Sequence, residues 1–390
     1  MIAEPMTGGD VQETGAVWRV PAVRALLAAS VLGFTSYAAT LSALPSYAVR
    51  SGAGVAAAGL VTTVFLAATV LTQVAVPRLV ARRGLGPVFA AGLLALGAPA
   101  PLYLLGDSLA WLSAVSTVRG AGFGVLTVLG STIAARAVPE SRRGEALGVY
   151  GLALAVPTLA AVPGGVALTL GGHFPVVAWL AAVPVLGLAA VPALVRAVPG
   201  AVTQASGQPS GPAVRASLGP SAVLLVVTLA GAGLVTFLPI ARPDGLVATA
   251  ALLVFGVVGA VARWGGGVLA DRVGSRVVLP PALLVGAAGL AALSLGLGSD
   301  VAVLLGAAAF GAAFGGVQNT TIVVAMARAG EQGTTTASAV WNAAFDAGTG
   351  IGALAVGVLA AALGLDLAYA VLAAVLVLAV PLALRVTRPR

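Results

Sequence analysis

The sequence predicts an all-α integral membrane protein whose twelve transmembrane helices form two pseudo-symmetric six-helix bundles. Three observations predict this fold class: the shortage of charged residues, the spacing of the apolar stretches and an internal repeat. Of the 390 residues, 59% are hydrophobic and 8% are charged. In a soluble domain about a quarter of the residues are charged. Lipid rather than water must therefore surround most of this surface.

Twelve apolar stretches, each long enough to cross a bilayer, follow one another along the chain. A spanning helix needs about 20 predominantly apolar residues. The predicted spans lie near 22–48, 56–76, 88–106, 109–134, 146–170, 174–195, 219–241, 246–270, 277–297, 301–326, 336–363 and 366–385. Pro and Gly inside these spans are compatible with membrane helices, because neighbouring helices satisfy the freed backbone groups.

The basic residues predict the orientation of the spans. All 20 of them are arginines. If both termini lie inside, only Arg50 and Arg242 fall outside, while Arg119 and Arg263 lie within spans. The other sixteen fall inside: 19, 24, 78, 82, 83, 136, 142, 143, 196, 215, 272, 276, 328, 385, 388 and 390. This bias predicts cytoplasmic termini in a cell membrane of the bacterial inner-membrane type. It also explains the net charge of +8 without a nucleic-acid partner, since no basic face alternates with stacking aromatics.

Short matches between the two halves of the chain indicate a duplicated six-helix unit. Residues 79–84 (LVARRG) and 269–274 (LADRVG) are 190 positions apart, and residues 120–124 (GAGFG) and 311–315 (GAAFG) are 191 apart. A third match, ARA at 135 and at 327, is 192 apart.

The repeat and a Gly-, Pro- and Ser-rich linker define the predicted organisation. It consists of a cytoplasmic tail at 1–21, a first bundle at 22–195, a cytoplasmic linker at 196–218, a second bundle at 219–385 and a tail at 386–390. Two joined bundles suit a transporter in which one half rocks against the other around a site near the midplane.

Several segments resemble the major facilitator superfamily over the whole length of the chain. Residues 267–276 (GVLADRVGSR) resemble its loop signature G-x-L-A-D-R-x-G-x-R, and Arg119 with Gly122 and Gly124 resembles its second motif. Residues 139–148 and 341–348 are most similar to its sugar-efflux-like, drug and metallophore exporters. Gly151, Pro157, Gly164 and Gly165 resemble the Gly/Pro-rich motif of its proton-driven exporters.

This resemblance implies a secondary active transporter, and we expect a proton-coupled exporter (an antiporter) of a small organic molecule. The alternative within transporters is a proton-coupled importer of an organic anion or a sugar. The distant alternative is a membrane-embedded enzyme or a non-transporting sensor. We expect no enzymatic activity, and a monomer whose partners are substrate, protons and membrane lipid.

Asp346 is the only carboxylate that falls in the interior of a predicted span, about ten residues from its start, since Asp366 stands at the very beginning of its span. An ionisable group in the bilayer is a functional candidate because its charge is costly there. A low dielectric favours the neutral form of a carboxyl group, and a nearby Arg favours the charged form. Alternation between such environments would couple protonation to conformation. We therefore expect Asp346 to be the proton site; a permanent ion pair with Arg119 or Arg263 is the alternative.

The two intramembrane arginines outnumber the single Asp, which leaves one positive charge without a partner. An anionic substrate group, held in a bidentate manner, would supply that partner. Arg263 is the better candidate for this contact, unless it is a helix-end Arg that extends toward the interface. Arg119 is a second substrate candidate, or its donors are satisfied by backbone carbonyls of the first span.

Other polar and aromatic residues inside the spans are candidates for the substrate path, because amides are costly in lipid and should face the interior. A helix–helix hydrogen bond is the alternative role for each of them. The substrate-binding candidates are Tyr37, Gln73, Gln318, Asn319, Trp341 and Asn342. We expect the Gly pairs 120/124, 311/315 and 348/352 to serve helix packing.

The loop signature is also the predicted gate. Its residues are Gly267, Asp271, Arg272, Gly274 and Arg276. The family arrangement implies that Asp271 contacts the start of the fifth span, near 144–147, where a helix N-terminus stabilises a carboxylate.

Other chemistries have no sequence support. The chain has no Cys and one His, so thiolate and His-cluster metal sites are excluded. It has no phosphate-binding Gly-Lys-Ser/Thr loop. We therefore expect no cofactor and no metal, with the proton gradient as the source of energy.

Overall fold

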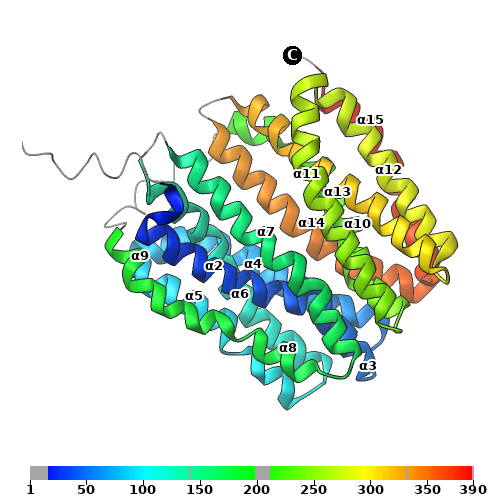
Figure 1. The fold of residues 1–390 in the computed structure, drawn as a ribbon, viewed down its shortest axis with the longest axis horizontal. Coiled ribbons are helices and arrows are strands. Elements are labelled where there is room, and N and C mark those ends of the chain that lie inside the picture. Colours follow the sequence, from blue (N-terminus) through cyan, green and yellow to red (C-terminus); the bar gives the residue numbers. More distant parts are fainter. Residues whose placement is uncertain (1–15, 140–141, 198–210, 331–332, 389–390) are drawn as a thin grey trace, which may run out of the picture.

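The structure, a computed structural model, describes residues 16–139, 142–197, 211–330 and 333–388, which form helices joined by short connections (Figure 1). The first half contains α2 (Pro21–Leu41), α3 (Ala43–Arg50), α4 (Val55–Arg83), α5 (Leu85–Gly97), α6 (Leu109–Arg136), α7 (Arg143–Leu170), α8 (Phe174–Leu180) and α9 (Val191–Ala197), with the 3-10 helices η1 (Val17–Arg19), η2 (Ala100–Leu105) and η4 (Val183–Ala190). The second half contains α10 (Gly211–Ala241), α11 (Leu246–Val273), α12 (Ser275–Gly296), α13 (Asp300–Ala329), α14 (Thr334–Leu363) and α15 (Leu365–Val386).

The predicted all-α fold with twelve spans is confirmed, since twelve helical segments of the described chain are long and apolar enough to cross a membrane. Three of these segments are interrupted where prolines remove backbone donors. The first breaks at Ser42, because Pro45 has no N–H for the carbonyl of Leu41. The third changes to a 3-10 helix after Pro99, and the sixth contains Pro184 within η4.

The seventh span begins earlier than predicted. We expected a linker over 196–218, but α10 already starts at Gly211. Ala213 and Ser217 are buried on this extension, and the Ser217 hydroxyl donates to the Ala213 carbonyl at 2.8 Å. The linker composition therefore concealed about two helical turns, 211–218, at the start of this span. The remaining linker residues, 198–210, lie outside the described part of the chain.

The two halves stand side by side, with the blue-to-green helices of the first half next to the yellow-to-red helices of the second (Figure 1). We call the side where α4, α6 and α11 end the arginine-rich face, because Arg82, Arg136 and Arg272 lie in their last turns. The opposite side is the far face.

Equivalent glycines pack the same helix pair in both halves, which supports the predicted duplication. A Cβ on Gly120 of α6 would collide with the backbone of Phe65 on α4. Its repeat partner, Gly311 of α13, lies in the same way against the backbone of Phe255 on α11. Residues 65 and 255 are 190 positions apart, and residues 120 and 311 are 191 apart. The packing role predicted for these glycines therefore agrees with the geometry, and the contacts provide a structural register for the repeat.

Besides a smaller contact of α3 with α10, two long seams join the halves, and both are packed toward the far face. We call α4 against α14 the first seam and α7 against α11 the second. In the first seam Gly59 packs against Ala353, and Thr63 donates to the Gly350 carbonyl at 2.8 Å. In the second seam Leu159 packs against Gly256.

Toward the arginine-rich face the seams separate. Val74 on α4 is 67% exposed and Val156 on α7 is 63% exposed. Asn342 on α14 and Arg263 on α11 are also exposed. An Arg or Asn side chain that faced lipid at this depth would be costly. These exposed polar groups therefore indicate an opening that water can reach from the arginine-rich face.

Arg50 and Arg242, predicted to lie on the outer side of the membrane, each cap the end of a helix at the far face. Arg50 donates to the carbonyl of Leu170, the last residue of α7, at 2.8 Å. Arg242 donates to the Leu297 carbonyl at 3.1 Å and pairs with Asp300 and Asp244. The hydrogen bonds that Arg242 donates to Asp300 and, second, to Asp244 raise the pKa of Arg242 above its ordinary value. Cations at helix C-termini are favourable because the last carbonyls lack intrahelical donors.

The repeat packing predicts unequal tolerance to alanine. Gly120→Ala and Gly311→Ala should each destabilise the protein by ~1–3 kcal/mol or more, since the methyl group forces two backbones apart. Gly151→Ala is the matched control, because its Cβ would meet no atom within 4 Å and alanine favours a helix by about 0.5–1 kcal/mol. Thermal melting in detergent, followed by size-exclusion chromatography, measures the difference. Equal melting of Gly120→Ala and Gly151→Ala would contradict the packing argument.

Candidate functional site

Asp346 lies near the middle of α14 and contacts the other half of the protein. Its Oδ2 accepts a hydrogen bond from Gln73 Nε2 of α4 at 2.9 Å. The same amide nitrogen donates to Thr127 Oγ1 of α6 at 3.1 Å. Both amide hydrogens of Gln73 are thus used, and a polar chain runs from α6 through α4 to Asp346 across the first seam.

No arginine pairs with Asp346 in the described part of the chain. The ion pairs there are those of Arg242. The predicted alternative, an ion pair between Asp346 and Arg119 or Arg263, is therefore not formed in this conformation. Tyr37 of α2 is close enough to Asp346 for an electrostatic interaction. Among the described residues, then, Asp346 faces one amide donor and one phenol but no cation.

Arg119 is completely buried, with 0% of its surface exposed, and is saturated by neutral oxygens. Its Nε donates to the Leu96 carbonyl at 3.0 Å. Its Nη1 donates to Thr40 Oγ1 at 3.2 Å and to the Tyr103 hydroxyl at 3.1 Å. Its Nη2 donates to Ser36, to Oγ at 2.9 Å and to the carbonyl at 3.3 Å. A guanidinium has five N–H donors, so every donor of Arg119 has a partner.

The predicted alternative, in which backbone carbonyls of the first span satisfy Arg119, holds only in part: of its acceptors, the Ser36 carbonyl alone is one of these, and the others are hydroxyls and the Leu96 carbonyl. The cation also lies over the rings of Tyr103 and Phe65, 5.3 and 6.0 Å from their centroids. Arg119 therefore holds α2, α5 and α6 together.

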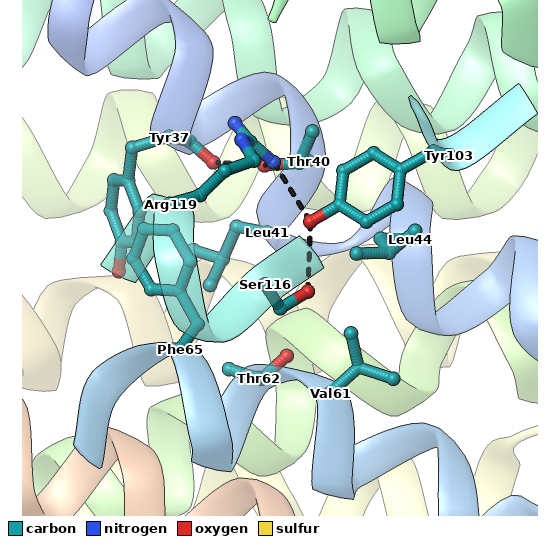
Figure 2. Close-up of a pocket in the computed structure, with 10 residues that line it drawn as sticks. All are labelled: Tyr37, Thr40, Leu41, Leu44, Val61, Thr62, Phe65, Tyr103, Ser116 and Arg119. Atoms are coloured by element: carbon teal, nitrogen blue, oxygen red, sulfur yellow. Dashed lines mark hydrogen bonds between the residues drawn. The ribbon is translucent and has the colours of Figure 1, made fainter. Parts of the chain in front are cut away.

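A pocket borders Arg119 inside the first half. Figure 2 shows Arg119, Tyr103 and Ser116 connected by hydrogen bonds along one side of it. Its volume is about 20 Å³, which is room for about one water molecule and far below the roughly 300–1,000 Å³ of a typical ligand pocket. The residues that line it are Tyr37, Thr40, Leu41, Leu44, Val61, Thr62, Phe65, Tyr103, Ser116 and Arg119. Because Arg119 has no free donor, this pocket is a poor site for an anion.

Tyr37 belongs to an aromatic cluster between α2, α4 and α6. Its ring stacks on Phe123 at 4.4 Å and on Phe65 at 5.6 Å, and Phe34 meets Phe123 edge-on at 5.1 Å. The second half repeats one of these contacts, since Phe255 and Phe314 lie 5.2 Å apart where Phe65 and Phe123 lie 5.7 Å apart.

Arg263 differs from Arg119 in almost every respect. It is exposed, and its one side-chain bond among the described residues runs from Nη1 to Gln318 Oε1 at 3.3 Å. The Asn319 side chain donates to the backbone carbonyl of Arg263 at 2.8 Å. The structure therefore brings three predicted candidates, Arg263, Gln318 and Asn319, together between α11 and α13.

The two remaining candidates on α14 take different positions. Trp341 is buried, and its Nε1 donates to Thr321 Oγ1 of α13 at 3.0 Å, so it packs two helices together. Asn342 is exposed one turn before Asp346, and its amide donates to the Ser338 carbonyl at 2.8 Å. Asn342 therefore lies on the open side of the first seam, whereas Trp341 does not.

The family model of the Major Facilitator Superfamily matches residues 26–342. The chain belongs to this superfamily. Among solved structures, a bacterial homolog of the human lysosomal transporter Spinster, in an inward-facing and occupied conformation, has a TM-score of 0.71 and 17% identity, and the match covers 94% of each chain. The nucleoside transporter NupG has a TM-score of 0.72 and 14% identity, and covers 95% of this chain and 100% of its own. Identities this low show a shared fold alone. No curated protein matches the sequence.

The structure describes only some of the residues in the predicted gate. Gly274 ends α11 with a φ of +86°, and its repeat partner Gly84 ends α4 with a φ of +82°. This left-handed conformation favours glycine. Arg272 and Arg276 are exposed beside it. Gly267 has no side chain, and the side chains of Asp271 and of 143–145 lie outside the described residues, so the contact of Asp271 with the fifth span remains a prediction.

Sequence reasoning missed Thr127 and Tyr103, the partners of Gln73 and Arg119. Thr127 carried a weak signal, since it lies one turn after Gly124 and thus on the face of α6 that packs against α4. Tyr103 carried none, because η2 brings it to Arg119 through a bend that its neighbouring prolines create.

The contrast between the two intramembrane arginines is testable through stability. Arg119→Lys leaves at least two buried oxygens without a donor and should destabilise the protein by ~2–5 kcal/mol. Arg263→Lys, the matched control, should change the stability by less than about 0.5 kcal/mol, as exposed substitutions usually do. Melting temperatures of the purified variants in one detergent measure both effects. Similar losses in the two variants would refute the assigned roles.

Proposed function

We propose that this protein is a proton-coupled carrier that exports a small organic molecule by alternating access. The major facilitator fold, the family match and the structural neighbours indicate a transporter and not an enzyme. The observation that supports proton coupling is the hydrogen bond from Gln73 to Asp346 across the first seam. Among the described spans, Asp346 is the carboxylate near the middle of a helix, and this hydrogen bond lies where the two halves meet.

In the proposed cycle, protonation of Asp346 loosens the first seam. An ionised carboxylate accepts a charge-assisted bond from Gln73, which is about twice as strong as a neutral one. A protonated Asp346 has no negative charge to hold that amide. The neutral side chain is also less costly while the seam rearranges within the bilayer. Release of the proton restores the bond and the packed far face.

The two seams supply the moving parts of alternating access. Both are closed at the far face and open at the arginine-rich face, which corresponds to one end state of such a cycle. The other end state requires Gly59 to leave Ala353 and Leu159 to leave Gly256 while the opposite ends close. Close glycine packing within each half, as of Gly120 on Phe65 and Gly311 on Phe255, supports motion of each bundle as a rigid body.

The arginine distribution supports the cytoplasmic position of the arginine-rich face and of both termini in the cell membrane. Export, rather than import, rests on the similarity of 139–148 and 341–348 to exporters of the superfamily. The alternative is proton-coupled import of an organic anion or a sugar. Membrane vesicles of both orientations, with the pH gradient imposed in each direction, distinguish the two by the direction in which an added compound collapses the gradient.

Asp346→Asn should abolish proton-driven transport while it leaves gradient-independent exchange of the same compound measurable. The amide keeps the size and a hydrogen-bond acceptor for Gln73 but cannot bind and release a proton. Proteoliposomes that contain a pH-sensitive dye report the proton movement, and labelled compound reports exchange. The control is Asp244→Asn at the far face, which should transport protons at nearly the wild-type rate. Retained coupling in Asp346→Asn would refute the assignment.

A further inference from the structure

The repeat allows the two seams to be compared residue by residue. Glycine packing aligns α4 with α11 at an offset of 190 and α6 with α13 at an offset of 191. Gln73 on α4 therefore corresponds to Arg263 on α11, and Thr127 on α6 corresponds to Gln318 on α13. Both pairs are hydrogen-bonded, since Gln73 donates to Thr127 at 3.1 Å and Arg263 donates to Gln318 at 3.3 Å. Arg263 is thus the structural counterpart of the residue that binds Asp346.

The same comparison identifies the residue of α7 that lies opposite Arg263. In the first seam Leu66 packs against Gly350; Gln73 is seven residues further along α4, and Asp346 is four residues back along α14. In the second seam Gly256 packs against Leu159. Seven residues further along α11 is Arg263, and four residues back along α7 is Ala155. A methyl group therefore occupies the position where the first seam carries a carboxylate.

This part of the second seam is open. Ala155 and Arg263 are both exposed. Leu152 and Val156, which share the face of α7 with Leu159, are 64% and 63% exposed. They provide an apolar surface beside the open position. Arg263 has five N–H donors and uses one of them on Gln318, and none of the described carboxylates pairs with it.

We propose that Arg263 binds the anionic group of the transported molecule, and that this molecule is a small organic carboxylate with an apolar body. The ligand carboxylate takes the place opposite Arg263 that Asp346 takes opposite Gln73. A planar carboxylate matches the fork of a guanidinium, while Leu152 and Val156 contact the apolar body. Gln318 is a positioning residue that orients the guanidinium. The proposal rests on the proposed function as a carrier.

Benzoate is the probe for this site, and benzamide is its neutral isostere. Benzoate should raise the melting temperature of the detergent-solubilised protein with an apparent Kd of about 10 mM or lower, whereas benzamide should not. Arg263→Gln should weaken benzoate binding by about tenfold or more through loss of the charge-assisted pair. Arg78→Gln removes the same charge from an exposed position on α4 and should leave benzoate binding unchanged.

A second pair of variants keeps the proposal falsifiable if Arg263→Gln does not fold. Ala155→Asp supplies the chain with its own carboxylate opposite Arg263, so benzoate should bind about tenfold more weakly than in Ala155→Asn, which has the same size without the charge. Equal stabilisation by benzoate and benzamide, no stabilisation at all, or equal binding by Ala155→Asp and Ala155→Asn would each overturn the proposal.

The binding test uses no membrane and no proton gradient, so it is independent of Asp346. If benzoate binds as expected while Asp346→Asn keeps its proton coupling, the anion site stands and the proton site fails. If Asp346→Asn loses proton coupling while Arg263→Gln binds benzoate as tightly as the wild type, the carrier mechanism stands and the proposed anion site is wrong.

Discussion

Inside a bilayer a polar group must find its hydrogen-bond partner within the protein, because lipid offers none. This constraint makes every span helical and gives the three intramembrane charges different roles. Arg119 meets the constraint completely, with five neutral oxygens around one guanidinium. Asp346 meets it through a bond to the opposite half. Arg263 meets it only in part. A charged group whose hydrogen bonds are all made within the fold is structural. A group with unused hydrogen-bonding capacity is the better candidate to bind a proton or a ligand.

The internal repeat provides two copies of one scaffold, and the residues proposed to act in transport lie where the copies differ. The shared part is the packing of α4 on α6 and of α11 on α13 through equivalent glycines. Arg119 has the buried Phe310 as its counterpart, at an offset of 191. One half thus places a hydrogen-bonded guanidinium where the other places a phenyl ring, and the seams also differ in their polar side chains. Backbone contacts preserve the register, so side chains at the seams can change without loss of the fold.

The two seams also explain how a proton could act on a carrier of this fold. A hydrogen bond inside one bundle would only stiffen it, whereas the Gln73–Asp346 bond crosses between bodies that must separate. Its position matters as well, because Val74, the next residue of α4, and Asn342, one turn earlier on α14, are both exposed. A change in charge there acts at the boundary between the closed and the open part.

The sequence by itself determined the fold class, the twelve spans, the repeat and the presence of three unusual charges. These features follow from composition and spacing, since hydrocarbon thickness sets helix length and lipid excludes charge. The tertiary structure alone decided which partner each charge has. Asp346 and Gln73 are 273 positions apart, and neither hydropathy nor spacing encodes the rotation of two helices about each other. That rotation depends on contacts such as Gly59 on Ala353, which become specific only when the bundles pack.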